Sequence, residues 1–433
     1  MNSTDYDILL VGAGIVGAAL ALSLTRSGWR VAVVDQSAAA PFSDNAQPDL
    51  RVSALSAASE RWLRELDVWP SIESRRFAPF RRMSVWEQTP QPLSQIPALS
   101  RLASQARTTF DAADLGRAQL GHVVENALTQ SALWQALEQD GRTTLLAPAS
   151  VSGLEPLEDR VRVHLEDRTL NASLVVAADG AASLTRQLAG IGTSRDQYPQ
   201  QAMVMTVAHA GPPQDITWQM FTPQGPRAYL PLPTLNGQCW GSLVWYDQPA
   251  TLDRLQGLPE EALIAEINRH FPSALPAIEA LPARGRFPIA RQHAHQYHRG
   301  RVVLVGDAAH TINPLAGQGL NLGLQDARCL GELLRQARRR QGDPGESALL
   351  AAYEAERRPE NRLMMSAMDL FYHGFSNAHP PLWLLRNLSL GLAGALSPAR
   401  NEVARYAMGL DSRLSQPVKT LLRRWPLNAQ SAS

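Results

Sequence analysis

The sequence predicts an α/β protein in which a parallel-sheet domain carries an inserted antiparallel sheet and ends in a helical C-terminal segment. Three observations indicate this fold class. A strand, a glycine-rich turn and a helix open the chain within residues 8–24, and two later apolar strands, at 174–178 and 302–305, end in turns of aspartate and glycine. Residues 200–250 alternate in polarity, are rich in Trp, Tyr, Thr and Val, and are punctuated by proline and glycine, as in an antiparallel sheet.

The first turn has the spacing of a dinucleotide-binding fingerprint in a Rossmann-like βαβ unit. The stretch "YDILLVGAGIVG" (6–17) joins a strand to helix 18–24 through GxGxxG, and a second strand, 30–34, ends in an acid. In such units the first glycine permits the tight turn, the second lets the backbone approach a pyrophosphate, and the third lets helix and strand pack closely. The phosphates lie at the helix N-terminus, and the acid accepts hydrogen bonds from a ribose. The residues expected to bind a nucleotide here are Gly12, Gly14, Ile15, Val16, Gly17 and Asp35.

The two later turns help to distinguish between nucleotides. "LVVAADGAASLTR" (174–186) contains Asp179 and Gly180, and "GDAAHTINPLAGQGLNLG" (306–323) leads from a strand into a helix over 320–334. A simple nicotinamide dehydrogenase needs neither turn, so three turns in this order favour FAD over NAD. The glycines of the last turn keep Cβ atoms away from a ligand, and its proline fixes φ and holds the loop rigid. The binding residues expected there are Gly306, Asp307, Pro314, Gly317, Gly319, Leu320 and Asn321.

The composition argues against several other classes of function. A formal net charge of +1 disfavours a nucleic-acid-binding surface, and a single lysine, Lys419, disfavours lysine Schiff-base chemistry. Cys239 and Cys329 follow no metal-ligand spacing and fit a reducing cytoplasm rather than a disulfide framework. No apolar run reaches ~18 residues, and the acidic N-terminus runs straight into a strand, so neither a transmembrane helix nor a signal peptide is expected.

The order GxGxxG, DG, GD resembles that of the flavin monooxygenases with the p-hydroxybenzoate hydroxylase fold. The resemblance implies FAD as the cofactor and NAD(P)H as the electron donor. It implies that Asp307 binds the ribityl region of FAD, and that Asp179 and Gly180 lie close to both FAD and the pyridine nucleotide. Further FAD contacts are implied for Arg51, Glu125 and Asn126, the last two in a helix expected over 120–137.

Within that fold, the stretch 306–323 resembles the ubiquinone-biosynthesis hydroxylases. The segments "QPDLRVSALSAAS" (47–59), "FTPQGPRAYLPL" (221–232), "SLVWYDQPA" (242–250) and "MDLFYHGFSN" (368–377) extend this similarity. The resemblance implies hydroxylation of a polyprenyl benzoquinol, 2-octaprenyl-3-methyl-6-methoxy-1,4-benzoquinol, by O₂ through a flavin C4a-hydroperoxide, with other ubiquinone-biosynthesis proteins as further partners. The alternatives are a hydroxylase for a different ring position, a flavin monooxygenase on a soluble aromatic, and a non-catalytic binding module of the same fold.

Two groups of histidines permit both a functional and a structural interpretation. His310 follows the GD turn, so it is either a candidate catalytic residue near the flavin ring, together with Pro314, or a structural histidine that caps the turn. His293, His295 and His298 lack an accompanying carboxylate or cysteine. For them we expect a solvated segment and no metal site.

Two other segments leave a membrane contact open. The arginines of "IESRRFAPFRRM" (72–83) are expected on a solvated face, with contact to acidic lipid headgroups as the alternative. The tail segments 380–396 and 418–427 are expected either to pack on the nucleotide domain or to touch a membrane peripherally. The expected location is the cytoplasm, with peripheral contact at the inner face of the cytoplasmic membrane as the second possibility.

These features predict three regions along the chain. The FAD-binding domain is discontinuous because the antiparallel sheet is inserted into it. The expected boundaries are 1–80, 111–190 and 285–365 for the FAD-binding domain, 81–110 and 191–284 for the substrate domain, and 366–433 for the helical C-terminal region.

Overall fold

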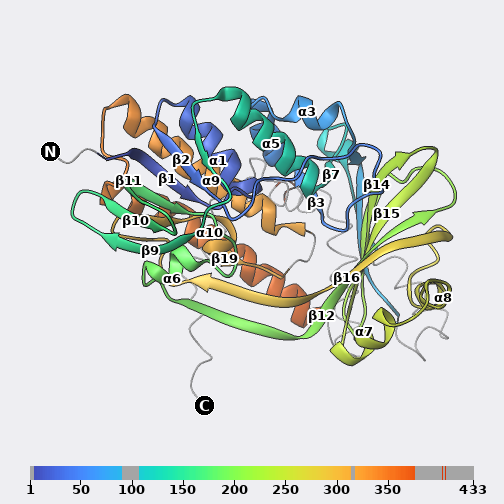
Figure 1. Ribbon diagram of the computed structural model, residues 1–433. Helices are drawn as coiled ribbons and strands as arrows, with labels where there is room; N and C mark the ends of the chain where they lie inside the picture. The colour runs from blue at the N-terminus through green and yellow to red at the C-terminus, as the bar shows by residue number, and fades with distance from the viewer. Residues whose placement is uncertain (1–3, 90–106, 314–316, 376–401, 403–404, 406–433) are drawn as a thin grey trace, which may run out of the picture.

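The computed structural model describes residues 4–89, 107–313, 317–375, 402 and 405. These residues form an α/β fold with three β-sheets, which confirms the predicted fold class. Figure 1 shows one part built on a parallel sheet and a second part built on an antiparallel sheet. The long strands β12 (Thr193–His209) and β16 (Ile278–Ala294) run from the first part into the second.

The parallel sheet contains the strands that precede the three predicted turns. Its strands are β1 (Tyr6–Val11), β2 (Val31–Val34), β8 (Thr144–Leu146), β9 (Val151–Pro156), β10 (Val161–Leu165), β11 (Thr169–Ala177), β17 (His298–Arg299) and β18 (Val302–Leu304). The order β18-β11-β1-β2-β8 is parallel throughout, and β17, β10 and β9 add antiparallel pairs at its sides. β2 and β18 are buried along their whole length, as expected for short apolar strands covered on both faces. All three turns therefore follow the carboxyl ends of parallel neighbours.

Three helices pack together beside this sheet. Helix α1 (Ile15–Arg26) follows the first glycine turn and contacts both α5 (Asn126–Asp140) and α9 (Gly319–Arg339). Figure 1 shows the three helices grouped on one side of the parallel sheet. Their N-termini follow strand ends, where a helix terminus offers free N–H groups to a ligand.

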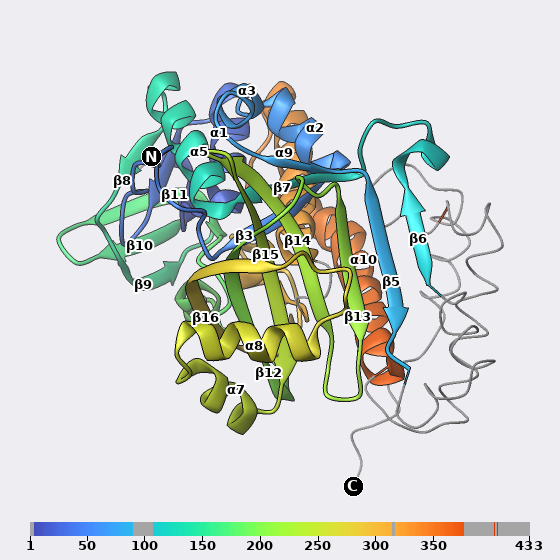
Figure 2. The same ribbon diagram turned by 90° about the vertical axis from the view of Figure 1, so that its right-hand side faces the viewer.

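The antiparallel sheet has two differently covered faces. Its order is β19-β16-β12-β15-β14-β13-β5-β6, with only β13 and β5 parallel. Helices α7 (Pro249–Gln256) and α8 (Glu260–His270) lie over one face, where Met205, Leu243 and Trp245 are buried (Figure 2). The other strands of this sheet are β5 (Arg82–Glu87), β6 (Thr108–Asp111), β13 (Ile216–Phe221), β14 (Arg227–Leu235), β15 (Gln238–Asp247) and β19 (His310–Thr311).

A small sheet, β3 (Val52–Ser56), β7 (Gly121–Glu125) and β4 (Ala78–Phe80), joins the two parts. The prediction of a helix over 120–137 was wrong at its start, because residues 121–125 form β7 and the helix begins at Asn126. Val123 and Val124 are β-branched, and Val123 pairs with both β3 and β4. Strand pairing with distant segments therefore decides this stretch against its helical spacing.

A helical segment lies at the C-terminal end of the described residues, as predicted. Helix α10 (Ser347–Phe375) packs on α9. The tail segments 380–396 and 418–427 lie outside the described residues. No helix among the described residues is long and apolar enough to cross a membrane. The remaining short elements are α2 (Ala57–Glu65), α3 (Trp69–Glu73), α6 (Leu184–Leu188) and single 3₁₀ turns at Ala112–Leu115 and Gly306–Ala308.

Candidate active site

The three glycines of the first turn have different surroundings. Gly12 has φ +99°, and a Cβ there would stand 2.4 Å from the carbonyl oxygen of Ala178. A Cβ on Gly17 would stand 2.0 Å from the carbonyl oxygen of Gly12. A Cβ on Gly14 would meet nothing within 4 Å. Gly12 and Gly17 are therefore needed for packing, whereas Gly14 borders open space at the N-terminus of α1, where a pyrophosphate fits.

Ala13 fixes the position of this turn through both of its backbone polar groups. Its N–H donates to Oδ2 of Asp35 at 2.6 Å, and its carbonyl accepts from Nε2 of Gln130 at 3.2 Å and Nε1 of Trp134 at 2.8 Å. Asp35, expected to bind a ribose, thus also anchors the turn. Gln130 and Trp134 were not predicted from the sequence to support this turn, although their spacing of four residues places them on one face of α5.

The DG turn is held by its own side chains. Oδ1 of Asp179 accepts from Ser183 Oγ at 2.5 Å, and Oδ2 accepts from the N–H and Oγ1 of Thr185 at 3.0 and 2.9 Å. Gly180 follows with φ +80° and open space where a Cβ would lie. The Asp179 carboxylate therefore shapes the turn, and Gly180 keeps its outer side open.

Arg186, a buried residue that the sequence analysis did not select, connects the DG and GD turns. Its Nη1 donates to the carbonyls of Ala181 at 3.2 Å and Ala308 at 2.9 Å. Because one guanidinium holds both turns, their separation is fixed across β11 and β18. The sequence shows Arg186 only as an arginine near the start of a short helix, which does not indicate this role.

The GD turn presents the carboxylate of Asp307 to solvent. Among the described residues, none donates a hydrogen bond to the side chain of Asp307, which is reachable by solvent. Although the side chain is exposed, the protein packed around it raises the pKa of Asp307, while the charges of His310 and Arg51 act in the opposite direction. An exposed carboxylate without a partner among the described residues fits the hydroxyl groups of a bound cofactor.

His310 follows the turn, is buried, and is not among the residues that line the cavity described below. Its Nε2 stands 2.5 Å from Oδ2 of Asp326, and both side chains are buried. Asp326 also accepts from the Gly306 N–H at 3.2 Å, Arg357 Nε at 2.8 Å and Asn361 Nδ2 at 2.9 Å. Burial would raise the pKa of Asp326, but the charges and hydrogen bonds of these partners lower it to about 2. This position matches the structural interpretation of His310.

The last glycines lead into the N-terminus of α9. Gly317 has φ +62°, and α9 starts at Gly319, so the N–H groups of its first turn lack acceptors within the helix. Leu320 and Asn321 belong to that first turn. The Asn321 side chain is buried and pairs with the β3–α2 turn, accepting from Ser56 N at 2.9 Å and Ser59 Oγ at 2.7 Å and donating to the Ala54 carbonyl at 2.9 Å. Pro314 lies outside the described residues.

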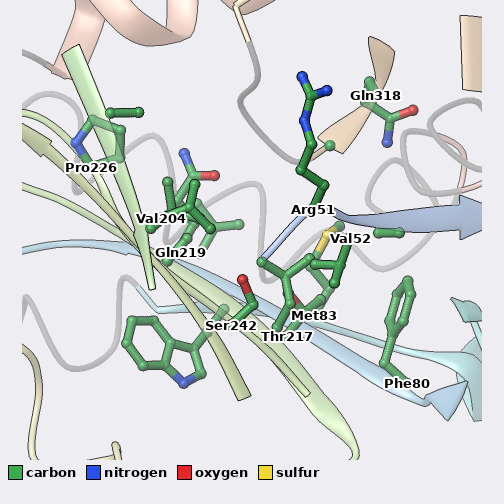
Figure 3. Close-up of a pocket in the computed structure, with 18 of the residues that line it drawn as sticks. Arg51, Val52, Phe80, Met83, Val204, Thr217, Gln219, Pro226, Ser242 and Gln318 are labelled. Carbon is green, nitrogen blue, oxygen red and sulfur yellow. The ribbon is translucent and has the colours of Figure 1, made fainter. Parts of the chain in front are cut away.

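A cavity of about 380 Å³ lies between the start of α9, β3 and the antiparallel sheet. Gly317, Gln318, Arg51 and Asn126 line one side, and strand residues such as Val204 line the other. Figure 3 shows Arg51 and Gln318 across the cavity from Val204 and Ser242. Most of the lining is apolar, as in sites that bind apolar ring compounds. The remaining lining residues are Leu50, Val52, Ala54, Ser56, Phe80, Met83, Val85, Phe110, Leu120, Ala202, Thr217, Trp218, Gln219, Pro226, Ala228, Leu230, Val244, Tyr246 and Phe287.

The arginines of 72–83 do not form one solvated face. Arg76 is buried and pairs with Glu125, with Nε to Oε2 at 2.6 Å and Nη2 to Oε1 at 2.9 Å. Its Nη1 also donates to the Ala46 carbonyl at 2.6 Å. Glu125 is therefore occupied by this ion pair, and of the two residues expected to contact FAD only Asn126 lines the cavity. Arg81 and Arg82 are exposed, as predicted.

The histidine segment was also predicted wrongly in part. His293 lies in β16, opposite His310 of β19, and its Nε2 stands 3.0 Å from the hydroxyl oxygen of Tyr297. Burial, followed by the charges of His310 and Arg358, lowers the pKa of His293 to about 3. His295 is exposed, and a search of the described residues finds no cluster of three or more potential metal ligands.

The chain is similar to several known proteins. The family model described as "FAD binding domain" matches residues 5–367. The 3-demethoxyubiquinol 3-hydroxylase of Escherichia coli is 43% identical, over 95% of this chain and 100% of that protein. The ubiquinone hydroxylase UbiL of Rhodospirillum rubrum is 36% identical, over 97% of this chain and 93% of that protein.

A solved structure shows the same fold at low identity. The p-nitrophenol 4-monooxygenase PnpA of Pseudomonas putida superposes with a TM-score of 0.75 at 19% identity, covering 94% of this chain and 98% of its own. The chain therefore belongs to the FAD binding domain family and is an FAD-dependent monooxygenase homologous to the ubiquinone hydroxylases.

Proposed function

We propose that this enzyme hydroxylates the ring of a demethoxyubiquinol, 2-octaprenyl-3-methyl-6-methoxy-1,4-benzoquinol, in ubiquinone biosynthesis. The observation that carries the proposal is the largely apolar cavity of about 380 Å³ that lies directly against Arg51 and the start of α9. An apolar ring with a few oxygen substituents suits such a wall. Similarity over the full length of a demethoxyubiquinol hydroxylase supports this substrate over a soluble aromatic.

The residues of the three turns fit FAD. The open space at Gly14 and the N-terminus of α1 suit the pyrophosphate, Asp35 suits a ribose, and the unbonded Asp307 carboxylate suits the ribityl hydroxyls. Arg51 and the N–H groups at the start of α9 would lie at the isoalloxazine end. When bound, FAD supplies the chemistry, accepting a hydride from NAD(P)H and activating O₂ to transfer one oxygen atom to the ring.

The protein's own tasks are to position the ring, exclude water and stabilise charge. The apolar sheet wall excludes water from the cavity. The N-terminus of α9 carries partial positive charge, which stabilises negative charge on the reduced cofactor. An electron-rich quinol needs no strong catalytic base, in keeping with the position of His310 outside the cavity.

The test is the quinone intermediate that accumulates when the gene is deleted. We expect the demethoxy intermediate, little ubiquinone, and isotope from labelled O₂ on the ring in the complemented strain. An earlier prenylphenol would instead assign a different ring position, and unchanged ubiquinone would reject the pathway. A colourless purified protein that binds no FAD would support a binding module.

We also propose that the enzyme works in the cytoplasm with peripheral contact at the inner face of the cytoplasmic membrane. The reason is the substrate, whose polyprenyl chain partitions into the bilayer. Cosedimentation with vesicles of mixed zwitterionic and anionic lipids tests this contact. Other ubiquinone-biosynthesis proteins are the expected partners, and copurification from membranes under mild detergent tests that expectation.

A further inference from the structure

Ser242 is a buried polar residue in the wall of the cavity. Its side chain is fully buried and lines the cavity, and its Oγ has no hydrogen-bond partner among the residues that the structure describes. A buried hydroxyl without a partner costs free energy, so such a group in a native protein calls for a partner such as a bound ligand or an ordered water. Its isolation is therefore the observation that requires an explanation.

The neighbouring hydroxyls on the same face are all satisfied. Ser242 pairs across the sheet with Thr206 of β12 and Leu230 of β14. Thr206 donates to the carbonyl of Asp49 at 3.4 Å, and Thr217 of β13 donates to the carbonyl of Tyr229 at 2.8 Å. The contrast shows that the sheet can satisfy a hydroxyl on this face, and that it leaves the one on Ser242 free.

Gln219 is a second free polar group on this wall. It lies on β13 in register with Ala228 of β14, which in turn pairs with Val244 of β15. Its side chain is half-buried, lines the cavity and makes no hydrogen bond with any described residue. Figure 3 shows Ser242 and Gln219 on the sheet side of the cavity, with Arg51 and Gln318 on the opposite side.

We propose that Ser242 and Gln219 position the substrate by hydrogen bonding to oxygen substituents of its aromatic ring. This inference rests on the proposed function, because it takes an oxygenated ring as the ligand. A ring between the two walls meets Arg51 and the start of α9 on one side and these two polar groups on the other. In a cavity whose other strand residues are mostly apolar, two hydrogen bonds decide which ring carbon faces the reacting side.

The first test compares Ser242→Ala with the wild-type holoenzyme. The probes are a short-chain, water-soluble methoxybenzoquinol and the matching methylbenzene that lacks the ring oxygens, each followed by quenching of flavin fluorescence. Loss of one hydrogen bond should weaken quinol binding about three- to tenfold. Binding of the oxygen-free probe should not change. The thermal midpoint should stay or rise, because a buried unpartnered hydroxyl is removed.

Control variants separate positioning from packing. Val244→Ala, two residues along the same face, should weaken both probes equally, because it removes only apolar contact. Ser242→Thr restores a hydroxyl and should recover the discrimination between the probes. Gln219→Met keeps the side-chain length and should repeat the selective loss. In turnover, the Ser242 and Gln219 variants should release more hydrogen peroxide per NAD(P)H consumed than wild type, because the ring is misaligned.

Two outcomes would overturn the inference without touching the proposed function. One is a wild-type enzyme that hydroxylates the quinol while Ser242→Ala and Gln219→Met bind it unchanged. The other is an equal loss for both probes, which would make the two residues packing elements. If the wild-type holoenzyme itself fails to bind the quinol, the proposed function fails first and this inference fails with it.

Discussion

The side chain of Val16 lies directly over Gly323, where an added Cβ would stand 2.8 Å from Val16 Cγ2 and 3.2 Å from the Cα of Gly306. Val16 belongs to the first glycine turn, Gly306 to the GD turn and Gly323 to the first turns of α9. Three segments that are far apart in the sequence therefore meet at one point. The absence of a side chain at Gly323 lets α9 approach α1 closely enough to bring its N-terminus to the cavity.

Gly323→Ala should destabilise the protein, because a stiff valine and a backbone atom would both have to move. Overpacking of this kind costs about 1–3 kcal/mol. The matched control is Gly319→Ala in the same helix, where the nearest atom to a new Cβ is 3.9 Å away. Thermal unfolding of the two cofactor-free variants checks this, and equal midpoints would contradict the close approach at Val16.

Asp307→Ala should weaken FAD binding and leave the cofactor-free protein as stable as wild type. No described residue bonds this carboxylate, so only the ligand loses a partner, at a cost of about 1.5–3 kcal/mol for a charged hydrogen bond. Asp326→Ala is the contrast, since it removes a buried carboxylate with four partners and leaves the buried Arg357 with Glu360 as its remaining carboxylate partner. It should lower the thermal midpoint without FAD. Calorimetric titration of FAD gives the first effect, and unchanged affinity in Asp307→Ala would remove its assigned role.

The sequence predicted the turns well because their requirements are local. A glycine with positive φ, such as Gly12 or Gly317, depends on neighbours in the chain, and the spacing of a strand, a turn and a helix is visible in a short window. The presence of an antiparallel sheet was predicted for the same reason. The sequence did not show which of its residues face the cavity, because α7 and α8 bury the opposite face and both faces are rich in apolar residues.

The roles of individual polar side chains were harder to predict, because their partners come from distant segments. Asn321 was assigned to the ligand, yet its amide is occupied by Ser56 and Ser59, more than 260 residues earlier. The pair of Arg76 with Glu125 likewise depends on the pairing of β4 with β7. Such contacts leave no periodic signal, so composition alone made Arg76 look like a surface residue.

The partly buried His293 should make the protein less stable in mild acid. Its pKa in the folded protein is about 3, below the ordinary value of about 6.5, so between these values the unfolded chain binds a proton that the folded chain does not. Stability should therefore fall as pH drops from about 6.5 toward 3, by at most ~1.4 kcal/mol per pH unit from this group. His293→Gln should reduce the shift in thermal midpoint between pH 7.5 and pH 4.5.

His295→Gln is the control for that measurement, because His295 is exposed in the same segment and should leave the pH dependence as it is. An unchanged pH dependence in His293→Gln would show that this histidine is solvated after all. That result would support the prediction from the sequence that the segment is solvated.

Substitutions in the first glycine turn should separate the effect on cofactor binding from the effect on folding. Gly14 has φ −63° and ψ −178°, which any residue adopts, and a Cβ there meets no atom within 4 Å. Gly14→Val should therefore fold with a thermal midpoint near that of the cofactor-free wild type. It should nevertheless bind no FAD, because the valine fills the space that a pyrophosphate needs. Absorbance of the purified protein in the flavin band and the unfolding midpoint measure the two effects independently.

Gly17→Ala is the matched change three residues along the same turn, and it should do the reverse. Its Cβ would stand 2.0 Å from the carbonyl oxygen of Gly12, so α1 must shift away from β1 and the cofactor-free protein should unfold at a lower temperature. Full flavin content in Gly14→Val would mean that the pyrophosphate does not pass this point. A Gly14→Val protein as unstable as Gly17→Ala would mean instead that the open space at Gly14 is needed by the fold rather than by the ligand.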